Sequence, residues 1–324
     1  MITAGIDIGG TKSAVVIGRL SGDHWEILSK EQFATIPMQP DKMLSLYGSS
    51  LETQMTSLHL KPEDLKGIGI SCGGPLNSKE GRILSPPNLP GWDDVPVVDF
   101  FRKRYHLPCY LQNDANACAV AEWKYGAGKG SRNMAYLTFG TGLGAGLILN
   151  NQLYVGTNDM AGEIGHVRLT QQGPAGYGKI GSVEGYCSGG GIAQLGRTKV
   201  LESLGKGEKP ALLERCGSLE AITAKEIGDL ADEGDTLCRE IYHISGEKLG
   251  QALSILVDIL NLEVIVIGSI YARSRHLLVE SMEMVMRREC LPVPFQNCQI
   301  LPSALGEQVG DIASLSVSLG ISNI

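Results

Sequence analysis

The chain has 324 residues, more than one hydrophobic core usually holds, which favours two lobes that together form one catalytic unit. Apolar residues make up 43% and charged residues 19%, a balance that excludes a disordered chain. The formal net charge is −7 without any block of Lys and Arg, which argues against nucleic acid, and no run of about 20 apolar residues predicts a membrane span. We expect a cytoplasmic protein that binds small molecules.

The first third of the chain predicts strands that meander around a glycine turn, followed by a covering helix and a buried strand. A Pro- and Gly-rich stretch at 73–96 has no periodic pattern, and its length is typical of a binding loop. Alternation and helical spacing give the strands 2–8, 13–19, 25–33 and 67–72, and the helix 41–60.

The remainder predicts an α/β class. Strand, glycine-rich turn and strand hairpin occur at 2–33 and again at 134–155, which indicates two related lobes. The expected helices are 97–105, 115–124, 187–205, 223–233, 236–260, 272–288 and a closing helix from 305; the expected strands are 109–112, 134–139, 147–149, 152–155, 264–267 and 298–301.

Two glycine-rich loops, 7–12 and 139–146, each join one strand to the next. Without Cβ atoms, their N–H groups can approach phosphate oxygens closely. Neither loop has the GxxxxGK[ST] pattern, and the dinucleotide fingerprint that 140–145 matches needs a following helix, where a hairpin is expected. Each loop alone could equally be a hairpin turn without a ligand.

Asp7, which ends an apolar strand, suits a place near Mg²⁺ and phosphate, or else caps the Gly9-Gly10 turn.

Two more motifs, Asn113-Asp114-Ala115-Asn116 and Ala161-Gly162-Glu163-Ile164-Gly165-His166, complete a pattern with the two loops. Over nearly the whole chain, this pattern closely resembles the ROK family (repressor, open reading frame, kinase). The resemblance implies a two-lobed actin-like ATPase fold, related to ribonuclease H, with a cleft between a small lobe (1–112 with 306–324) and a larger lobe (113–305). It also implies ATP with Mg²⁺, phosphorylation of a hexose or N-acetylhexosamine, commonly at the 6-hydroxyl, and a homodimer.

The resemblance assigns Asp114 as the base that takes the proton of the sugar hydroxyl; the alternative is that Asp114 merely caps the helix that follows it. Glu163 and His166 are three residues apart, so both could hold adjacent sugar hydroxyls, whereas a lone histidine is more often buried and satisfied by backbone. The remaining positions are matched to the sugar (Asn88, Asn113, Glu163, His166, Glu184), to ATP (Asp7, Gly9, Gly10, Thr11, Lys12, Gly140, Thr141, Gly142, Gly144, Gly268) and to Mg²⁺ (Asp7). The family often has a further glycine where Ser269 stands.

The chain departs from the family in its zinc motif. Most members carry CxCGxxGCxE, whose cysteines bind Zn²⁺ with the histidine at the position of His166. Here Ala175, Tyr177 and Ser182 occupy the cysteine positions, so we predict no structural zinc. We expect packing of Tyr177, Ile180, Val183 and Tyr186 to position His166 and Glu184 instead.

The leading interpretation is an ATP-dependent sugar kinase. The alternative is a catalytically weak sugar-binding sensor that kept the pocket after losing zinc. Regulators of this family carry a helix-turn-helix segment ahead of the first loop, and only four residues precede Gly5 here, which argues against direct repression through DNA.

Overall fold

The computed structural model describes residues 1–320. Its internal contacts define two compact units: unit 1 is Met1–Tyr136, Gly146–Gly162 and the chain from Ala304 on, and unit 2 is Leu137–Ala145 and Glu163–Ser303. The small lobe expected from the sequence ended with 306–324, of which 321–324 lie outside the described residues.

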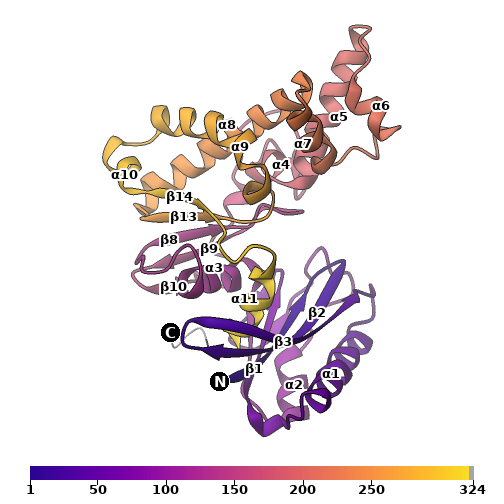
Figure 1. The fold of residues 1–324 in the computed structure, drawn as a ribbon, viewed down its shortest axis with the longest axis vertical. Coiled ribbons are helices and arrows are strands. Elements are labelled where there is room, and N and C mark those ends of the chain that lie inside the picture. The colour runs from indigo at the N-terminus through magenta and orange to yellow at the C-terminus, as the bar shows by residue number, and fades with distance from the viewer. Residues whose placement is uncertain (321–324) are drawn as a thin grey trace. The chain divides into compact units, whose positions relative to one another are not determined.

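The sheet of unit 1 has the strand order β3-β2-β1-β4-β7. Figure 1 labels three of its strands, β1, β2 and β3. Strands β1 and β2 form an antiparallel hairpin around the first glycine loop, and Ile8 pairs with Ser13. Strand β4 runs parallel to both β1 and β7, so three carboxyl ends meet at one sheet edge. The strands are β1 (Ile2–Ile8), β2 (Lys12–Ser21), β3 (His24–Ala34), β4 (Leu65–Cys72) and β7 (Cys109–Asn113), with the small pair β5 (Leu76–Asn77) and β6 (Arg82–Ile83).

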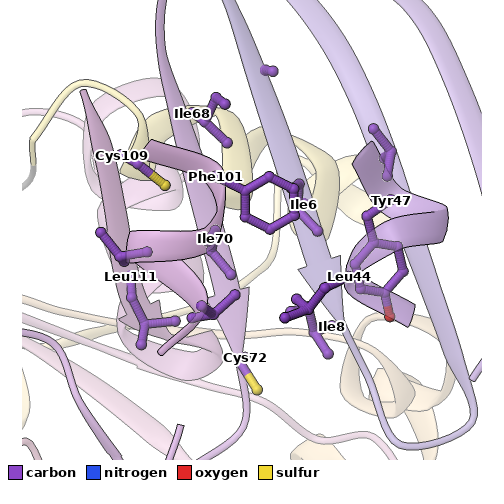
Figure 2. Packing of buried hydrophobic residues seen from close by; sticks show 14 of the residues in the cluster. Ile6, Ile8, Leu44, Tyr47, Ile68, Ile70, Cys72, Phe101, Cys109 and Leu111 are labelled. Atoms are coloured by element: carbon purple, nitrogen blue, oxygen red, sulfur yellow. The ribbon is translucent and has the colours of Figure 1, made fainter. Parts of the chain in front are cut away.

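One face of this sheet carries the core of unit 1. Side chains that alternate along the parallel strands, such as Ile6 and Ile70, pack with Leu44 of helix α1 (Pro40–Ser57) and Phe101 of helix α2 (Val97–Tyr105), as Figure 2 shows. All four are almost completely buried. The period of two that predicted the strands therefore also selects the face on which the helices lie.

The opposite face carries small residues. A Cβ at Gly5 would lie 2.3 Å from Oγ of Ser314, and one at Gly69 only 2.1 Å from the Ser314 carbonyl oxygen. Helix α11 (Val309–Val317) can approach this face because both positions are glycine. Helix α3 (Asp114–Tyr125) packs on α11, so it belongs to unit 1, whereas the lobes proposed from the sequence divide the chain before α3.

The second sheet has the order β10-β9-β8-β13-β14, which repeats the third-second-first-fourth-fifth order of the first sheet. This confirms the internal repeat expected from the sequence. Its strands are β8 (Met134–Leu137), β9 (Ala145–Leu149), β10 (Gln152–Tyr154), β13 (Val264–Ile267) and β14 (Gln299–Pro302).

Unit 2 is rich in helices, and the long ones match their sequence predictions closely. The six-residue helices α6 and α10 were not predicted, since a stretch this short shows too little of a helical period. The helices are α4 (Val183–Tyr186), α5 (Gly189–Gly205), α6 (Ala211–Cys216), α7 (Ala224–Glu233), α8 (Thr236–Leu260), α9 (Ile270–Glu289) and α10 (Pro292–Asn297). Within residues 1–320, no helix combines the length and the apolar character that crossing a membrane requires.

Candidate functional site

The carboxyl ends of β1, β4 and β7 bring polar residues together in unit 1. Asp7 pairs with Ser71 across β1 and β4, and Cys72 pairs with Asn113 across β4 and β7. Asp114 follows directly as the first residue of α3. Ligands of open parallel sheets bind at such edges, so chain topology alone places Asp7 and Asp114 where a site is expected.

Asn113 is the N-cap of helix α3. Its Oδ1 accepts hydrogen bonds from the N–H groups of Ala115, at 3.0 Å, and of Asn116, at 3.3 Å. Asp114 stands one position later, and its Oδ1 accepts from the Ala115 N–H at 2.8 Å. Asn113 thus fills the capping position that was the alternative role for Asp114, whose side chain is exposed.

The two carboxyl groups of this edge bind protons more tightly than usual. Desolvation by burial, followed by the charges of Asp114 and Asp311, raises the pKa of Asp7 to about 7, against the lowering effects of Ser71 and Lys30. Although Asp114 is accessible, desolvation by the surrounding protein raises its pKa too. A cation near Asp7 would relieve this unfavourable concentration of negative charge.

The surroundings of Asp7 fit Mg²⁺ that arrives with a nucleotide. Among residues 1–320, no group of three or more His, Cys, Asp or Glu side chains could form a metal cage. Mg²⁺ typically takes one or two protein carboxylates and completes its shell with water and substrate phosphates. One half-buried carboxylate beside a glycine loop has this character.

The first glycine loop is closed mainly by its own backbone. The Gly9 N–H donates to the Lys12 carbonyl at 3.1 Å, and the Thr35 hydroxyl donates to the Gly9 carbonyl at 2.6 Å. A Cβ at Gly10 would lie 2.4 Å from the Asn88 carbonyl oxygen, so this loop abuts a predicted sugar residue. Thr11 and Lys12 are exposed at the end of the loop.

Gly73 and Gly74 lie close to two amide side chains that are predicted to bind sugar. Cβ atoms at these glycines would be 3.4 Å from Nδ2 of Asn88 and 3.4 Å from Nδ2 of Asn113, respectively. The structure therefore gathers Gly10, Asn88 and Asn113 around one turn of unit 1. Nothing beyond the glycine-rich composition of 73–96 indicated this contact in the sequence.

The second glycine loop, in unit 2, is held by side chains and by distant segments. Oε2 of Glu184 accepts from the Leu143 N–H at 3.0 Å, and the Thr138 hydroxyl accepts from the Gly144 N–H at 2.8 Å. A Cβ at Gly165 would lie only 2.1 Å from the Leu143 carbonyl oxygen. Glu184 and the motif 161–166, both predicted to bind sugar, thus pack directly on the predicted phosphate loop.

The predicted adenosine loop adjoins the second glycine loop. The N–H of Gly268 donates to the Leu137 carbonyl at 3.0 Å, and the N–H of Ile270 donates to the Phe139 carbonyl at 2.9 Å. Between them, Ser269 has φ 51° and ψ −114°, a conformation that glycine adopts more readily. This agrees with the glycine that the family often has there.

A pocket of about 530 Å³ opens beside these two loops, a usual size for a small-molecule site. Sequence reasoning missed most of its wall, because α5, α7, α9 and the turn at 219–223 contribute single residues without a shared motif. Arg197 fixes that turn by donating to the Leu219 carbonyl at 2.9 Å. The lining is Gly140, Thr141, Gly189, Gly190, Ala193, Arg197, Glu220, Ile222, Thr223, Ala224, Lys225, Ser269, Ile270 and Arg273.

Glu163 and His166 lie on one short helical turn, as their spacing predicted. Glu163 caps the 3₁₀ turn Ile164–His166, and its carbonyl accepts from the His166 N–H at 3.1 Å. Both side chains are exposed, so the interpretation of His166 as a buried structural histidine is wrong.

Hydrogen bonds hold the segment in which most family members bind zinc. The Ser182 hydroxyl oxygen accepts from the N–H groups of Gly176, at 3.2 Å, and Gly185, at 3.1 Å. The Gln194 amide accepts from the Ala175 N–H at 3.1 Å and donates to the Ala175 carbonyl at 2.9 Å. Two of the three cysteine positions are thus tied by polar contacts.

The packing expected in this segment is only half correct. Val183 and Tyr186 are buried, but Tyr177 and Ile180 are 67% and 51% exposed, so these two do not fill the space of a metal. The Tyr177 ring instead meets the His166 ring edge-on, with centroids 6.0 Å apart.

The fold and these motifs define a member of the actin-like ATPase superfamily. The chain belongs to the ROK family, which it matches over residues 3–316. It is 31% identical over 314 residues to a protein named Glucokinase from Halalkalibacterium halodurans, covering 95% of this chain and 92% of the relative. It is 30% identical to a Xylose repressor from Caldicellulosiruptor bescii, covering 94% of this chain and 74% of the repressor.

A solved structure supports the fold. The ROK family glucokinase from Streptomyces griseus, in complex with glucose and AMPPNP, superimposes with a TM-score of 0.80 at 27% identity. The match covers 98% of this chain and 99% of that chain.

Proposed function

We propose that this protein is an ATP-dependent kinase that phosphorylates a hydroxyl of a hexose or N-acetylhexosamine, at the 6-position. The observation that carries the proposal is the placement of Asp114: its carboxyl group is accessible at the end of β7, while Asn113 takes over the capping of α3. The nucleotide-sized pocket of unit 2 and the kinases among the relatives support it.

In the reaction, the sugar hydroxyl oxygen attacks the γ-phosphorus of ATP, ADP leaves, and Asp114 takes the hydroxyl proton. The raised pKa of Asp114 makes it a stronger base than an ordinary carboxylate. The amides of Asn88 and Asn113 and the side chains of Glu163, His166 and Glu184 orient hydroxyls. Asp7 would hold Mg²⁺, which would neutralise charge on the phosphates.

In the nucleotide site, loop 9–12 of unit 1 and loop 140–144 of unit 2 approach the phosphates with backbone N–H groups. The N–H groups of Gly9, Leu143 and Gly144 hold the loops in shape by donating within the protein, so the phosphates bind to other N–H groups of the two loops. Gly268 and the pocket beside it hold the nucleoside. The use of Mg²⁺, the cytoplasmic location and the homodimer stay predictions of the family resemblance.

The test is a coupled assay of ADP release with glucose, fructose, mannose, allose and the N-acetylated amino sugars. Asp114→Asn should lower kcat by roughly 10²–10⁴, the range for loss of a general base, and leave sugar affinity in calorimetry nearly unchanged. Asp99→Asn is the matched control, since Asp99 is also an exposed acid in the first turn of a helix. An unchanged kcat in Asp114→Asn refutes the assignment, and binding of a sugar without turnover in the wild type favours the sensor.

A further inference from the structure

The segment without zinc ends in a tight hairpin whose turn contains Tyr177. Strands β11 (Ala175–Gly176) and β12 (Lys179–Ile180) pair with Gly176 opposite Lys179, which leaves Tyr177 and Gly178 as a two-residue turn. Both have positive φ, 46° and 73°. Positive φ at both central residues defines the type I′ turn, which strongly prefers Asn-Gly.

A tyrosine is a poor choice for the first position of this turn. A bulky residue with positive φ is strained, at a cost on the order of 1 kcal/mol or more. Burial does not compensate, because the Tyr177 side chain is 67% exposed. Strain of this kind, without a packing benefit, is typical of residues that serve a ligand.

The ring of Tyr177 lies beside the predicted sugar site. The planes of the Tyr177 and His166 rings are inclined at 74°, and most of the Tyr177 side chain, 67%, is accessible. Val167 and Ile180, from the neighbouring chain segments, are also exposed, at 37% and 51%. Exposed apolar side chains thus stand next to His166 in the sequence and on the hairpin that carries Tyr177.

We propose that Tyr177 determines substrate specificity by stacking on a second ring attached to the hexose, so that the substrate class is a disaccharide or another glycoside. This inference rests on the proposed function, since it takes His166 as a ligand of the sugar hydroxyls. The C–H face of a sugar ring is apolar and packs well on an aromatic face. Glu163, His166 and Glu184 serve the first ring, and the exposed ring of Tyr177 serves what extends beyond it.

The inference is tested with Tyr177→Asn, because asparagine suits the turn and removes the ring. Isothermal calorimetry and ADP release are measured with glucose, N-acetylglucosamine, maltose and cellobiose. We expect the wild type to bind at least one disaccharide more tightly than glucose. In the variant, the ratio of the two affinities should fall about tenfold, which corresponds to the loss of one aromatic stacking contact. Its Tm should not fall, and Tyr177→Phe should keep the preference.

Tyr154→Asn is the matched control, because Tyr154 is similarly exposed, at 51%, on β10. An equal preference in wild type and Tyr177→Asn overturns the inference, as does a wild-type preference for N-acetylglucosamine over both disaccharides. Tyr177→Gly repeats the test with the other residue that the turn favours.

Calorimetry separates this inference from the proposed kinase activity. If the preference in binding depends on Tyr177 but no sugar is turned over, the role of Tyr177 is supported and the proposed kinase activity is refuted. Turnover of glucose without any effect of Tyr177 would refute the inference alone.

Discussion

The two glycine loops look alike in the sequence but are built differently. The first is closed by bonds between residues near in sequence or on the next strand, such as Gly9 N–H to the Lys12 carbonyl. The second is held by Glu184, 41 residues beyond Leu143, and by the Gly189 N–H, which donates to the Gly140 carbonyl at 2.8 Å. The shape of the first loop therefore depends on contacts within and beside its own hairpin. The shape of the second loop depends on distant segments of unit 2.

This difference has a functional consequence. In the first loop, Gly10 lies against Asn88, which is predicted to bind sugar, mainly against its carbonyl group. In the second, a carboxylate predicted to bind sugar also anchors the predicted phosphate loop, so a change at Glu184 should affect both substrates.

Among changes that test the difference between the two loops, Glu184→Ala has the largest expected effect. Loss of a charged hydrogen bond of about 1.5–3 kcal/mol to the Leu143 N–H should lower kcat/KM for ATP roughly 10–100-fold, in addition to the loss of sugar affinity. Steady-state kinetics with each substrate varied in turn will measure it.

Glu184→Gln is the control for this variant, since its amide oxygen can still accept from the Leu143 N–H. It should weaken sugar binding and keep the KM for ATP within about threefold of the wild type. If Glu184→Ala leaves the ATP parameters unchanged, Glu184 is not the anchor that distinguishes the second loop from the first.

Much of the fold could be predicted from the sequence because local patterns determine it. The alternation of Ile6 and Ile8, and the helical period of 236–260, give elements whose bounds the structure reproduces within a few residues. The repeat of the hairpin at 134–155 predicted two related lobes, and the second sheet has the strand order of the first. The grouping of α3 with unit 1 could not be predicted, because it depends on the packing of α11, about 190 residues away, on Gly5 and Gly69.

The candidate site divides in the same way. The motif around Asp114 and the spacing of Glu163 and His166 are local and could be recognised. The pocket wall with Arg197 and Arg273 arises only when three helices come together, and no short pattern encodes it. Likewise, at two positions where the family motif has cysteine, Ala175 is bonded to Gln194 and Ser182 to Gly176, and these hydrogen bonds appear only in the folded chain.

The next effect concerns stability at the first loop, where Asp7 is kept in an unfavourable environment. Since burial and neighbouring acids raise its pKa to about 7, folded protein binds this proton more tightly than unfolded chain, and Asp7 makes the fold less stable as pH rises from about 4 to 7. In metal-free buffer without nucleotide, Asp7→Asn should therefore raise the Tm at pH 8 by at least about 2 °C, while kinase activity falls.

The pH dependence is the decisive part of this measurement. The difference in Tm between Asp7→Asn and the wild type should be small near pH 4, grow up to about pH 7 and change little from there to pH 8. Asp23→Asn, at an exposed acid, should show no such trend. A constant difference across this range would mean that the charge of Asp7 is not what destabilises the fold.

The smallest effect is expected for Thr35→Val, which removes a side-chain anchor of the first loop. The variant loses the bond from the Thr35 hydroxyl to the Gly9 carbonyl, at 2.6 Å, and the contact with the Ser13 hydroxyl, at 2.9 Å, but keeps the bond from the Thr35 N–H to the Thr11 carbonyl. Since the backbone bonds remain, the free energy of unfolding measured in urea should fall by only about 1 kcal/mol, and the KM for ATP should rise about threefold at most. Thr53→Val, on the exposed face of α1, is the control. A loss of ATP binding as large as that of Glu184→Ala would show that the first loop also depends on side chains, and the two loops would then be alike.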